Sequence, residues 1–257
     1  MRNHRSIHAI HPFTMACSAL LLLSLSPSSM AASYQASVYG GGTSTTFNHI
    51  GPVTFLEETD TLNPTNTLAT SGTWGLAAAL RTNTLPEGLK KCIEEVSFGP
   101  EFFYVNGNST GDVWQYQLPE MNNLTYKIST SSYRLLATNE ITFKPLAPKT
   151  FPFFAWGIGF AANESSYQEY PRATYDSPGL SLAAKTQYQF AYTFGGGLKI
   201  DVSDIAHTNH PVLLSFRYLY AHLGSADVSN QSSTVVTTPI EVNLYTQTWV
   251  AGLTYLF

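Results

Sequence analysis

The sequence predicts an all-β protein, an eight-stranded antiparallel transmembrane up-and-down β-barrel. The last fifteen residues, 243–257, alternate between apolar and small polar side chains and end on a phenylalanine, as the closing strand of a bacterial outer-membrane barrel does. Only 12% of the residues are charged, against about 25% in a typical soluble domain. No apolar run after residue 32 approaches the ~20 residues of a membrane-spanning helix, so a closed sheet must satisfy the backbone.

Residues 1–32 have the pattern of a secretory signal peptide. Arg2 and Arg5 give a positive start, a short apolar core follows, and small residues up to Ala32 offer a cleavage site. The predicted mature chain, 33–257, is the barrel. It keeps 11 basic and 17 acidic residues, a formal charge of −6, which does not favour a nucleic-acid partner.

Period-two alternation places the first four strands. Their expected ranges are 34–47, 72–82, 92–105 and 127–143. In each, bulky residues share the face expected to meet lipid. These residues are Tyr34 and Val38, Trp74 and Leu76, Phe98, and Tyr133 and Leu135.

The last four strands show the same alternation more strongly. Their expected ranges are 150–162, 185–202, 212–223 and 243–257. Bulky residues face lipid and small or polar residues face inward. The outward set is Phe154, Trp156, Ile158, Phe160, Tyr188, Phe190, Phe216, Tyr218, Trp249 and Leu253.

The connections alternate in length. Short ones are expected at 83–91, 144–149 and 203–210, and long polar ones at 48–71, 106–126, 163–184 and 224–242. This pattern is typical of a barrel with short periplasmic turns and long external loops. A secreted β-sandwich is the alternative fold, but its outer face would be polar. Loops on a rigid scaffold commonly bind partners, so a host or surface ligand is expected at the long loops.

Several charged residues fall on the inward face of the expected strands. An eight-stranded barrel is just wide enough for its side chains to fill. An unpaired charge in such an interior costs several kcal/mol, so we expect these groups to pair and plug the barrel. The set is Arg81, Glu95, Glu101, Arg134, Glu140, Lys199 and Arg217.

Three short segments carry a resemblance to a known family: Phe216–Gly224 (FRYLYAHLG), Phe194–Leu198 (FGGGL) and the closing Leu253–Phe257 (LTYLF). The chain resembles the small outer-membrane barrels of the OmpA-like, OmpX-like and opacity-like group, in particular Omp25/31-type surface antigens. The resemblance implies an outer-membrane location, with outer-membrane lipid and lipopolysaccharide around the barrel. It also implies that the barrel-assembly machinery reads the end of the last strand, through Trp249, Leu253, Tyr255 and Phe257.

His222 and Ser225 are the weak candidates for catalysis. Lipid A deacylases are eight-stranded barrels that carry a histidine base and a serine nucleophile near the rim. Here the two residues are three apart, which puts them on opposite faces of a regular strand. Nothing in the sequence places Glu241 as the orienting acid. A rim histidine without catalytic role is therefore favoured.

No metal or cofactor site is predicted. His207 and His210 lie in an expected turn near Asp204, where a solvated turn is favoured over a metal site. The glycine runs 40–42 and 195–197 are followed by no helix pattern, so they fit a tightly curved barrel better than a phosphate-binding loop.

The leading hypothesis is a non-enzymatic outer-membrane barrel that presents four long loops for envelope integrity or for contact with a host or surface. A narrow porin-like channel for ions or small solutes is the first alternative. A lipid A-modifying enzyme is the second.

Overall fold

The computed structural model describes residues 33–48, 50–55, 58–173, 179–206, 210–228, 236–238, 240 and 242–257. The predicted signal peptide, 1–32, and the candidate acid Glu241 lie outside these described residues.

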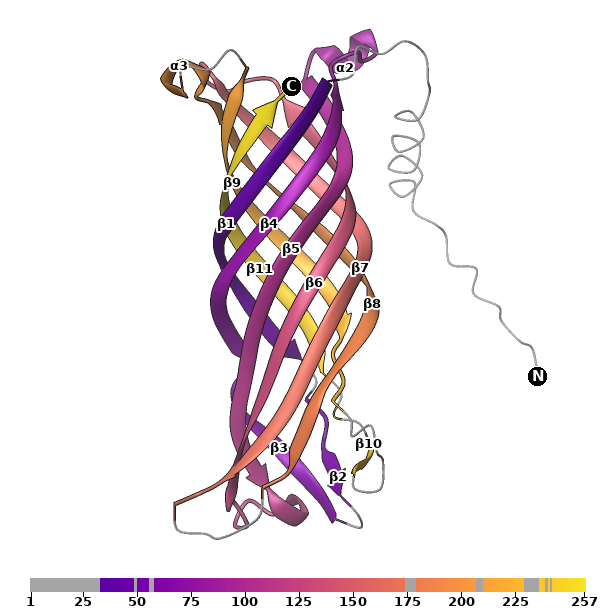
Figure 1. Ribbon diagram of the computed structural model, residues 1–257, viewed down its shortest axis with the longest axis vertical. Helices are drawn as coiled ribbons and strands as arrows, with labels where there is room; N and C mark the ends of the chain where they lie inside the picture. Colours follow the sequence, from indigo (N-terminus) through magenta and orange to yellow (C-terminus); the bar gives the residue numbers. More distant parts are fainter. Residues whose placement is uncertain are drawn as a thin grey trace, which may run out of the picture. The chain divides into compact units, whose positions relative to one another are not determined.

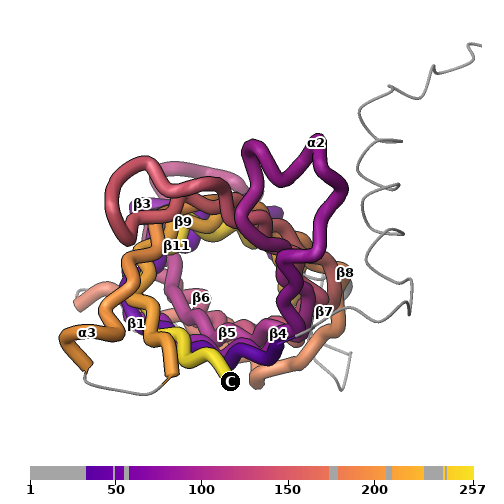
Figure 2. The backbone as a smooth tube through the Cα atoms, turned by 90° about the horizontal axis from the view of Figure 1, so that it is seen from above, coloured from indigo at the N-terminus to yellow at the C-terminus, as the bar shows by residue number. Residues whose placement is uncertain are grey.

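Eight long strands of the described chain form a closed antiparallel ring, which confirms the predicted fold class. They follow the order β1, β4, β5, β6, β7, β8, β9, β11, and β11 pairs again with β1. Seen from one end, the backbone makes a complete circle (Figure 2). The strands are β1 (Ser33–Asn48), β4 (Leu68–Thr82), β5 (Ile93–Trp114), β6 (Leu124–Phe143), β7 (Thr150–Pro171), β8 (Ser181–Asp201), β9 (Val212–Ser225) and β11 (Asn243–Leu256).

The two ends of the ring differ. One end carries the tight connection 144–149 and two four-residue helices, α2 (Glu87–Lys90) and α3 (Ser203–Ala206), in the three connections predicted to be short. The other end carries β2 (Val53–Phe55), β3 (Glu58–Asn66), β10 (Val236–Thr238) and the 3-10 turn η1 (Gln115–Gln117). Figure 1 shows α2 and α3 at one end and β2, β3 and β10 at the other. We call these the short-turn end and the long-hairpin end.

Glycines allow adjacent strands to approach closely. A Cβ added at Gly197 on β8 would lie 1.9 Å from the carbonyl oxygen of Phe216 on β9, and one at Gly195 would lie 2.0 Å from that of Tyr218. No side chain fits against backbone at that distance. The run 195–197 is therefore a packing requirement of the barrel wall, as the sequence predicted.

All four central strands are longer than predicted, β5 and β7 much longer and β6 and β8 by about three residues each. β5, β6, β7 and β8 contain 22, 20, 22 and 21 residues, whereas about 9–11 residues span a bilayer. The expected loops 106–126 and 163–184 are consequently mostly strand. The expected loop 48–71 holds β2 and β3, and 224–242 holds β10. The prediction that these stretches lie outside the strands was therefore wrong for most of 106–126 and 163–184 and for the parts of 48–71 and 224–242 that form β2, β3 and β10.

The physical reason is an inversion of polarity along each strand. Toward the short-turn end, apolar side chains point outward and polar ones inward. Toward the long-hairpin end, the alternation continues with polar residues outward and apolar residues inside, as in a water-soluble protein. Inward residues here include Val113, Ile128, Tyr167 and Leu182, which are at most 3% exposed. They belong to one buried apolar cluster that fills this half of the barrel.

β5 changes partner midway. It pairs with β4 from Val96 to Tyr104 and with β3 from Thr110 to Trp114. Between these two ladders, side chains supply the bonds: Thr73 Oγ1 donates to the Tyr104 carbonyl at 2.7 Å, and Ser71 Oγ to the Asn106 carbonyl at 2.6 Å. The strands thus form a fork in the barrel wall.

Candidate functional site

The seven charged residues predicted to face inward all line the interior of the apolar-walled half of the barrel. They come from β4, β5, β6, β8 and β9, which the ring brings around one space. All are buried except Arg81, whose side chain is 22% exposed.

One cluster lies nearer the short-turn end. Arg81 forms an ion pair with Glu95. The Lys199 Nζ lies 2.5 Å from Glu140 Oε1 and 3.5 Å from Glu95 Oε1, and it donates to Thr142 Oγ1 at 3.1 Å. Lys199 thereby links carboxylates on two strands, β5 and β6, from β8 across the interior.

A second cluster lies deeper along the strands. Arg217 Nη1 donates to Glu101 Oε2 at 2.8 Å, and the guanidinium lies over the ring of Tyr39, 4.7 Å from its centroid. Arg134 is fully buried and lies over the ring of Phe103 at 4.6 Å. Within the described part of the chain, its three guanidinium nitrogens have no hydrogen bond to a protein group. The aromatic face supports the cation in place of a carboxylate.

These side chains fill the interior. The cavity beside Gln35, Tyr39, Glu101 and Arg217 measures about 20 Å³, room for about one water molecule. Little open space therefore remains beside the Arg217–Glu101 pair.

The relative orientation of His222 and Ser225 on β9 differs from the prediction. β11 pairs Tyr245 with His222 but Leu244 with Gly224, so Leu223 is an extra residue, and Gly224 adopts φ 78°. This bulge shifts the alternation and places His222 and Ser225 on the same, outward face. The expectation of opposite faces was wrong. The imidazole nevertheless packs between Tyr192 and Tyr245, at 5.3 and 4.8 Å between ring centroids.

Asn163 on β7 fixes this bulge from inside the barrel. Its Nδ2 donates to the carbonyls of Leu223 at 2.7 Å and Ser225 at 2.9 Å, and its Oδ1 accepts from Ser132 Oγ at 2.6 Å. The Ser225 carbonyl therefore helps to stabilise the bulge. Among the described hydrogen bonds, none joins His222 to Ser225.

The four residues of the predicted insertion signal lie on the outer face of β11 and at its end. Trp249, Leu253 and Phe257 are 67%, 51% and 62% exposed. The Phe257 amide donates to the Tyr34 carbonyl at 2.9 Å, and its ring meets Tyr255 edge-on. The end of the last strand is thus hydrogen-bonded to β1, and its aromatic side chains lie on the outer face.

A carboxylate cluster at the long-hairpin end was not predicted. Buried Asp60 accepts the Tyr116 amide at 2.9 Å, and Glu169 accepts Tyr167 Oη at 2.6 Å. Burial raises the pKa of Asp60 to about 7, with Glu58 and Glu169 adding to the rise. Burial likewise raises the pKa of Glu169. Local sequence gave no signal, because β3 and β7 are distant in the chain.

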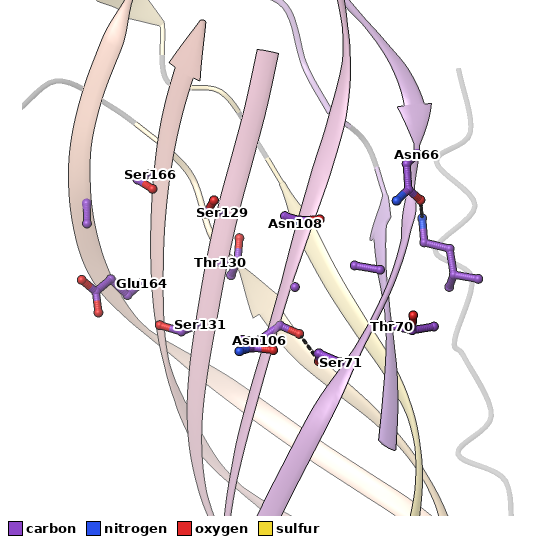
Figure 3. A pocket seen from close by; sticks show the side chains of 14 residues that line it. Asn66, Thr70, Ser71, Asn106, Asn108, Ser129, Thr130, Ser131, Glu164 and Ser166 are labelled. Atoms are coloured by element: carbon purple, nitrogen blue, oxygen red, sulfur yellow. Dashed lines mark hydrogen bonds between the residues drawn. The ribbon is translucent and has the colours of Figure 1, made fainter. Parts of the chain in front are cut away.

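A polar hollow of about 560 Å³ opens on the outer wall beside the strand fork. Figure 3 shows its polar side chains on neighbouring strands, with Ser71 bonded to Asn106. Among the side chains that line it are Thr70, Asn106, Asn108, Ser131, Glu164 and Ser166. The sequence placed Ser131 in an expected strand but Thr70, Asn106, Asn108, Glu164 and Ser166 in long polar connections, so the hollow was not predicted.

Metal binding finds no support in the described residues, where no group of three or more His, Cys, Asp and Glu could hold an ion. His210 belongs to the described chain, and His207 lies outside it. No helix among the described residues is long and apolar enough to cross a membrane.

A closed antiparallel ring with hydrocarbon outside and charges inside defines a transmembrane β-barrel of the bacterial outer membrane. The exposed residues Trp74, Leu135, Phe160 and Trp249 are part of its lipid-facing surface. The short-turn end faces the periplasm and the long-hairpin end faces outward, because barrels of this class keep their short turns inside.

No family model matches the sequence, and no curated protein matches it. Among solved structures, the chain is similar to Neisserial surface protein A (NspA), with 13% identity, a TM-score of 0.43, and coverage of 88% of this chain and 99% of that one. It is similar to the outer-membrane protease OmpT from Escherichia coli, with 8% identity, a TM-score of 0.45, and coverage of 90% and 100%. It is also similar to the outer-membrane protein AlkL, with 14% identity, a TM-score of 0.42, and coverage of 90% of this chain and 93% of that one. Likenesses this distant carry no conclusion about activity.

Proposed function

We propose that the protein is a non-enzymatic outer-membrane barrel that binds another macromolecule at the cell surface through the tip of the β5–β6 hairpin, residues 115–123. The carrying observation is that this tip is a defined shape with exposed apolar side chains. Tyr116, Leu118 and Met121 are 58%, 40% and 41% exposed, and they lie at the end opposite the short turns.

The tip has an unusual backbone. Tyr116 and Gln117 both adopt positive φ, 54° and 62°, although neither is glycine. The Tyr116 amide is bound by Asp60, and the Gln115 amide donates to the Met121 carbonyl at 3.2 Å. Consecutive left-handed residues that the surroundings hold in place are commonly found at binding sites.

The extension below the tip is stiff. β5 and β6 stay paired from Val113 and Leu124 down into the membrane-spanning half, and Arg172 adds an ion pair with Asp112 at 2.5 Å. Because the interior of the extension is a packed apolar cluster, it holds the tip at a fixed distance from the bilayer.

The filled interior favours this function over a channel. Arg217, Glu101 and Lys199 are each at most 3% exposed, and the apolar cluster occupies the barrel above them. A conducting pore would need a continuous wet path. Planar-bilayer recordings of the purified protein should accordingly show no conductance steps.

The test is binding by whole cells. The triple variant Tyr116→Ser, Leu118→Ser, Met121→Ser should lose attachment to host cells or extracellular-matrix protein, with unchanged heat-dependent gel migration of the barrel. Leu146→Ser, which removes a 76% exposed leucine at the short-turn end, is the matched control. Undiminished attachment of the triple variant would contradict the proposal. If detergent sensitivity changes instead, envelope integrity is the better function.

The bulge at Leu223 favours one second candidate, a lipid A-modifying hydrolase, because it brings His222 and Ser225 to one face. Ser225→Ala should then change the mass spectrum of lipid A. Identical spectra would exclude this activity.

A further inference from the structure

The outward residues of β5, β6, β7 and β8 stand in registered rows, and their chemistry changes abruptly along the strands. One row holds Asn106, Ser131, Glu164 and Thr186. Two residues toward the short-turn end, the next row holds Tyr104, Tyr133, Ala162 and Tyr188. The row after that holds Phe102, Leu135, Phe160 and Phe190.

The wall therefore passes from amides and hydroxyls through tyrosines to hydrocarbon within four residues, about 13 Å along a strand. Tyrosine concentrates at the boundary between acyl chains and headgroups of a bilayer. The rows thus locate the edge of the hydrocarbon on this side of the barrel.

An apolar groove of about 570 Å³ lies on the hydrocarbon side of that edge. Its floor is formed by the short side chains of Pro100 and Ala137, and its sides by Leu135, Ile158 and Phe160. A groove in a lipid-facing wall gives an acyl chain contacts on several sides, where a smooth wall gives them on one.

The polar hollow lies on the headgroup side of the same edge. Asn106, Ser131 and Ser166 offer amide and hydroxyl groups that both donate and accept. The residues lining it include neither lysine nor arginine, and their one charged group is the Glu164 carboxylate. This set matches the hydroxyl groups of a sugar and opposes a phosphate, which would need cationic partners.

We propose that groove and hollow together form a binding site for one glycolipid of the outer leaflet, with an acyl chain over Pro100 and Ala137 and a neutral sugar headgroup against Asn106, Ser131 and Glu164. One molecule spans both parts, because Leu135 at the groove and Ser131 at the hollow are four residues apart on β6 with Tyr133 between them. The assignment of barrel and membrane edge carries this inference. The hairpin tip plays no part in it.

The test uses full-length mature protein in phosphatidylcholine nanodiscs that also contain either a diglucosyl diacylglycerol or phosphatidylglycerol. Native mass spectrometry of the released barrel counts the retained lipid. We expect retention of the diglucosyl lipid above both phospholipids. Preferential retention of phosphatidylglycerol, or equal retention of all three lipids, would overturn the proposal.

Ala137→Phe should fill the groove and reduce retention of the diglucosyl lipid about tenfold, equivalent to about 1.4 kcal/mol. Ala251→Phe is the control, because Ala251 is also exposed on the lipid-facing wall but lies on β11, away from the groove. Heat-dependent migration checks that both variants fold. Equal retention by wild type and Ala137→Phe, or a groove covered by a second copy and seen as a dimer in the spectrum, would refute the site.

Glu164→Gln tests the headgroup. The diglucosyl lipid should bind to this variant at most severalfold less tightly than to wild type, because the amide oxygen still accepts hydrogen bonds. Phosphatidylglycerol should stay unbound. Glu120→Gln, which removes an exposed carboxylate at the tip, is the control. A gain of phosphatidylglycerol over the diglucosyl lipid on Glu164→Gln would show a site for an anionic lipid and contradict the neutral-sugar assignment.

Discussion

Arg217 on β9 and Glu101 on β5 form an ion pair at 2.8 Å across the interior of the barrel, although 116 residues separate them in the chain. Both are at most 3% exposed. The pair joins opposite arcs of the ring. It therefore depends on closure of the whole barrel.

Removing one member of this pair should be costly. Glu101→Gln leaves a buried guanidinium without its carboxylate, so we expect the free energy of unfolding to fall by about 3–5 kcal/mol in urea titrations of folded barrel. Lys144→Gln removes an exposed ion pair with Glu94 and should cost less than about 1 kcal/mol. The double variant Glu101→Met, Arg217→Met should recover most of the loss. A single variant as stable as wild type would mean that water solvates this interior.

The closest strand contact gives a second prediction. Gly197→Ala adds a methyl group only 1.9 Å from the Phe216 carbonyl oxygen. The strands must move apart to admit it, so the free energy of unfolding should fall by about 1–3 kcal/mol or more. Gly72→Ala is the matched control, since nothing lies within 4 Å of the added Cβ. Thermal melting followed by gel migration measures both. Equal melting of the two variants would argue against a tight β8–β9 approach.

The carboxylates at the long-hairpin end predict pH dependence. The pKa of Asp60 rises from 3.8 unfolded to about 7 folded, so between these values the folded state binds more protons than the unfolded state. Its contribution to stability is greatest below pH ~4 and is lost as the pH rises through about 7. The pKa of Glu169 is also raised and acts in the same direction.

Hydrogen exchange of β3 and η1, corrected for intrinsic rates, should therefore show faster local opening at pH 8 than at pH 5. Asp60→Asn should flatten this difference. Glu120→Gln, an exposed carboxylate at the same end, should leave it unchanged. Slower opening at pH 8 in the wild type would reverse the sign and contradict the cause given.

The end of β11 predicts an effect on assembly. If the insertion machinery reads Phe257, then Phe257→Ala should lower the fraction of heat-modifiable protein in the outer membrane of growing cells. Refolding into detergent micelles should change little, because the ring is largely exposed. Phe190→Ala removes a similarly exposed aromatic in β8 and is the control. An equal loss for both variants would show that bulk hydrophobicity, and not the position, matters.

The sequence predicted which charged residues lie inside the barrel, but it could not predict which of them form ion pairs. The inward position of Arg81, Glu101 and Arg217 follows from alternation within one strand. Which carboxylate meets which cation depends on the register of strands far apart in the sequence. The same holds for the hollow, whose residues come together from six strands, β3 to β8, and for the groove, whose residues come from four, β5 to β8.

Local exceptions to alternation were also beyond the pattern. His222 and Ser225 share a face because Leu223 is bulged out of the ladder and Gly224 takes a positive φ. A glycine near a strand end is compatible with such a bulge but does not locate it.

The sequence by itself determined the barrel, because hydrocarbon demands bulky apolar side chains at every second position and leaves the other positions to polar groups. Only the tertiary structure decided where the strands end. Above the membrane the solvent changes from lipid to water, so the polarity of the two faces inverts while the strand continues. The register between strands then places Arg217 against Glu101 and the polar hollow next to the apolar groove. Register is a property of the closed ring, so one strand alone does not reveal it.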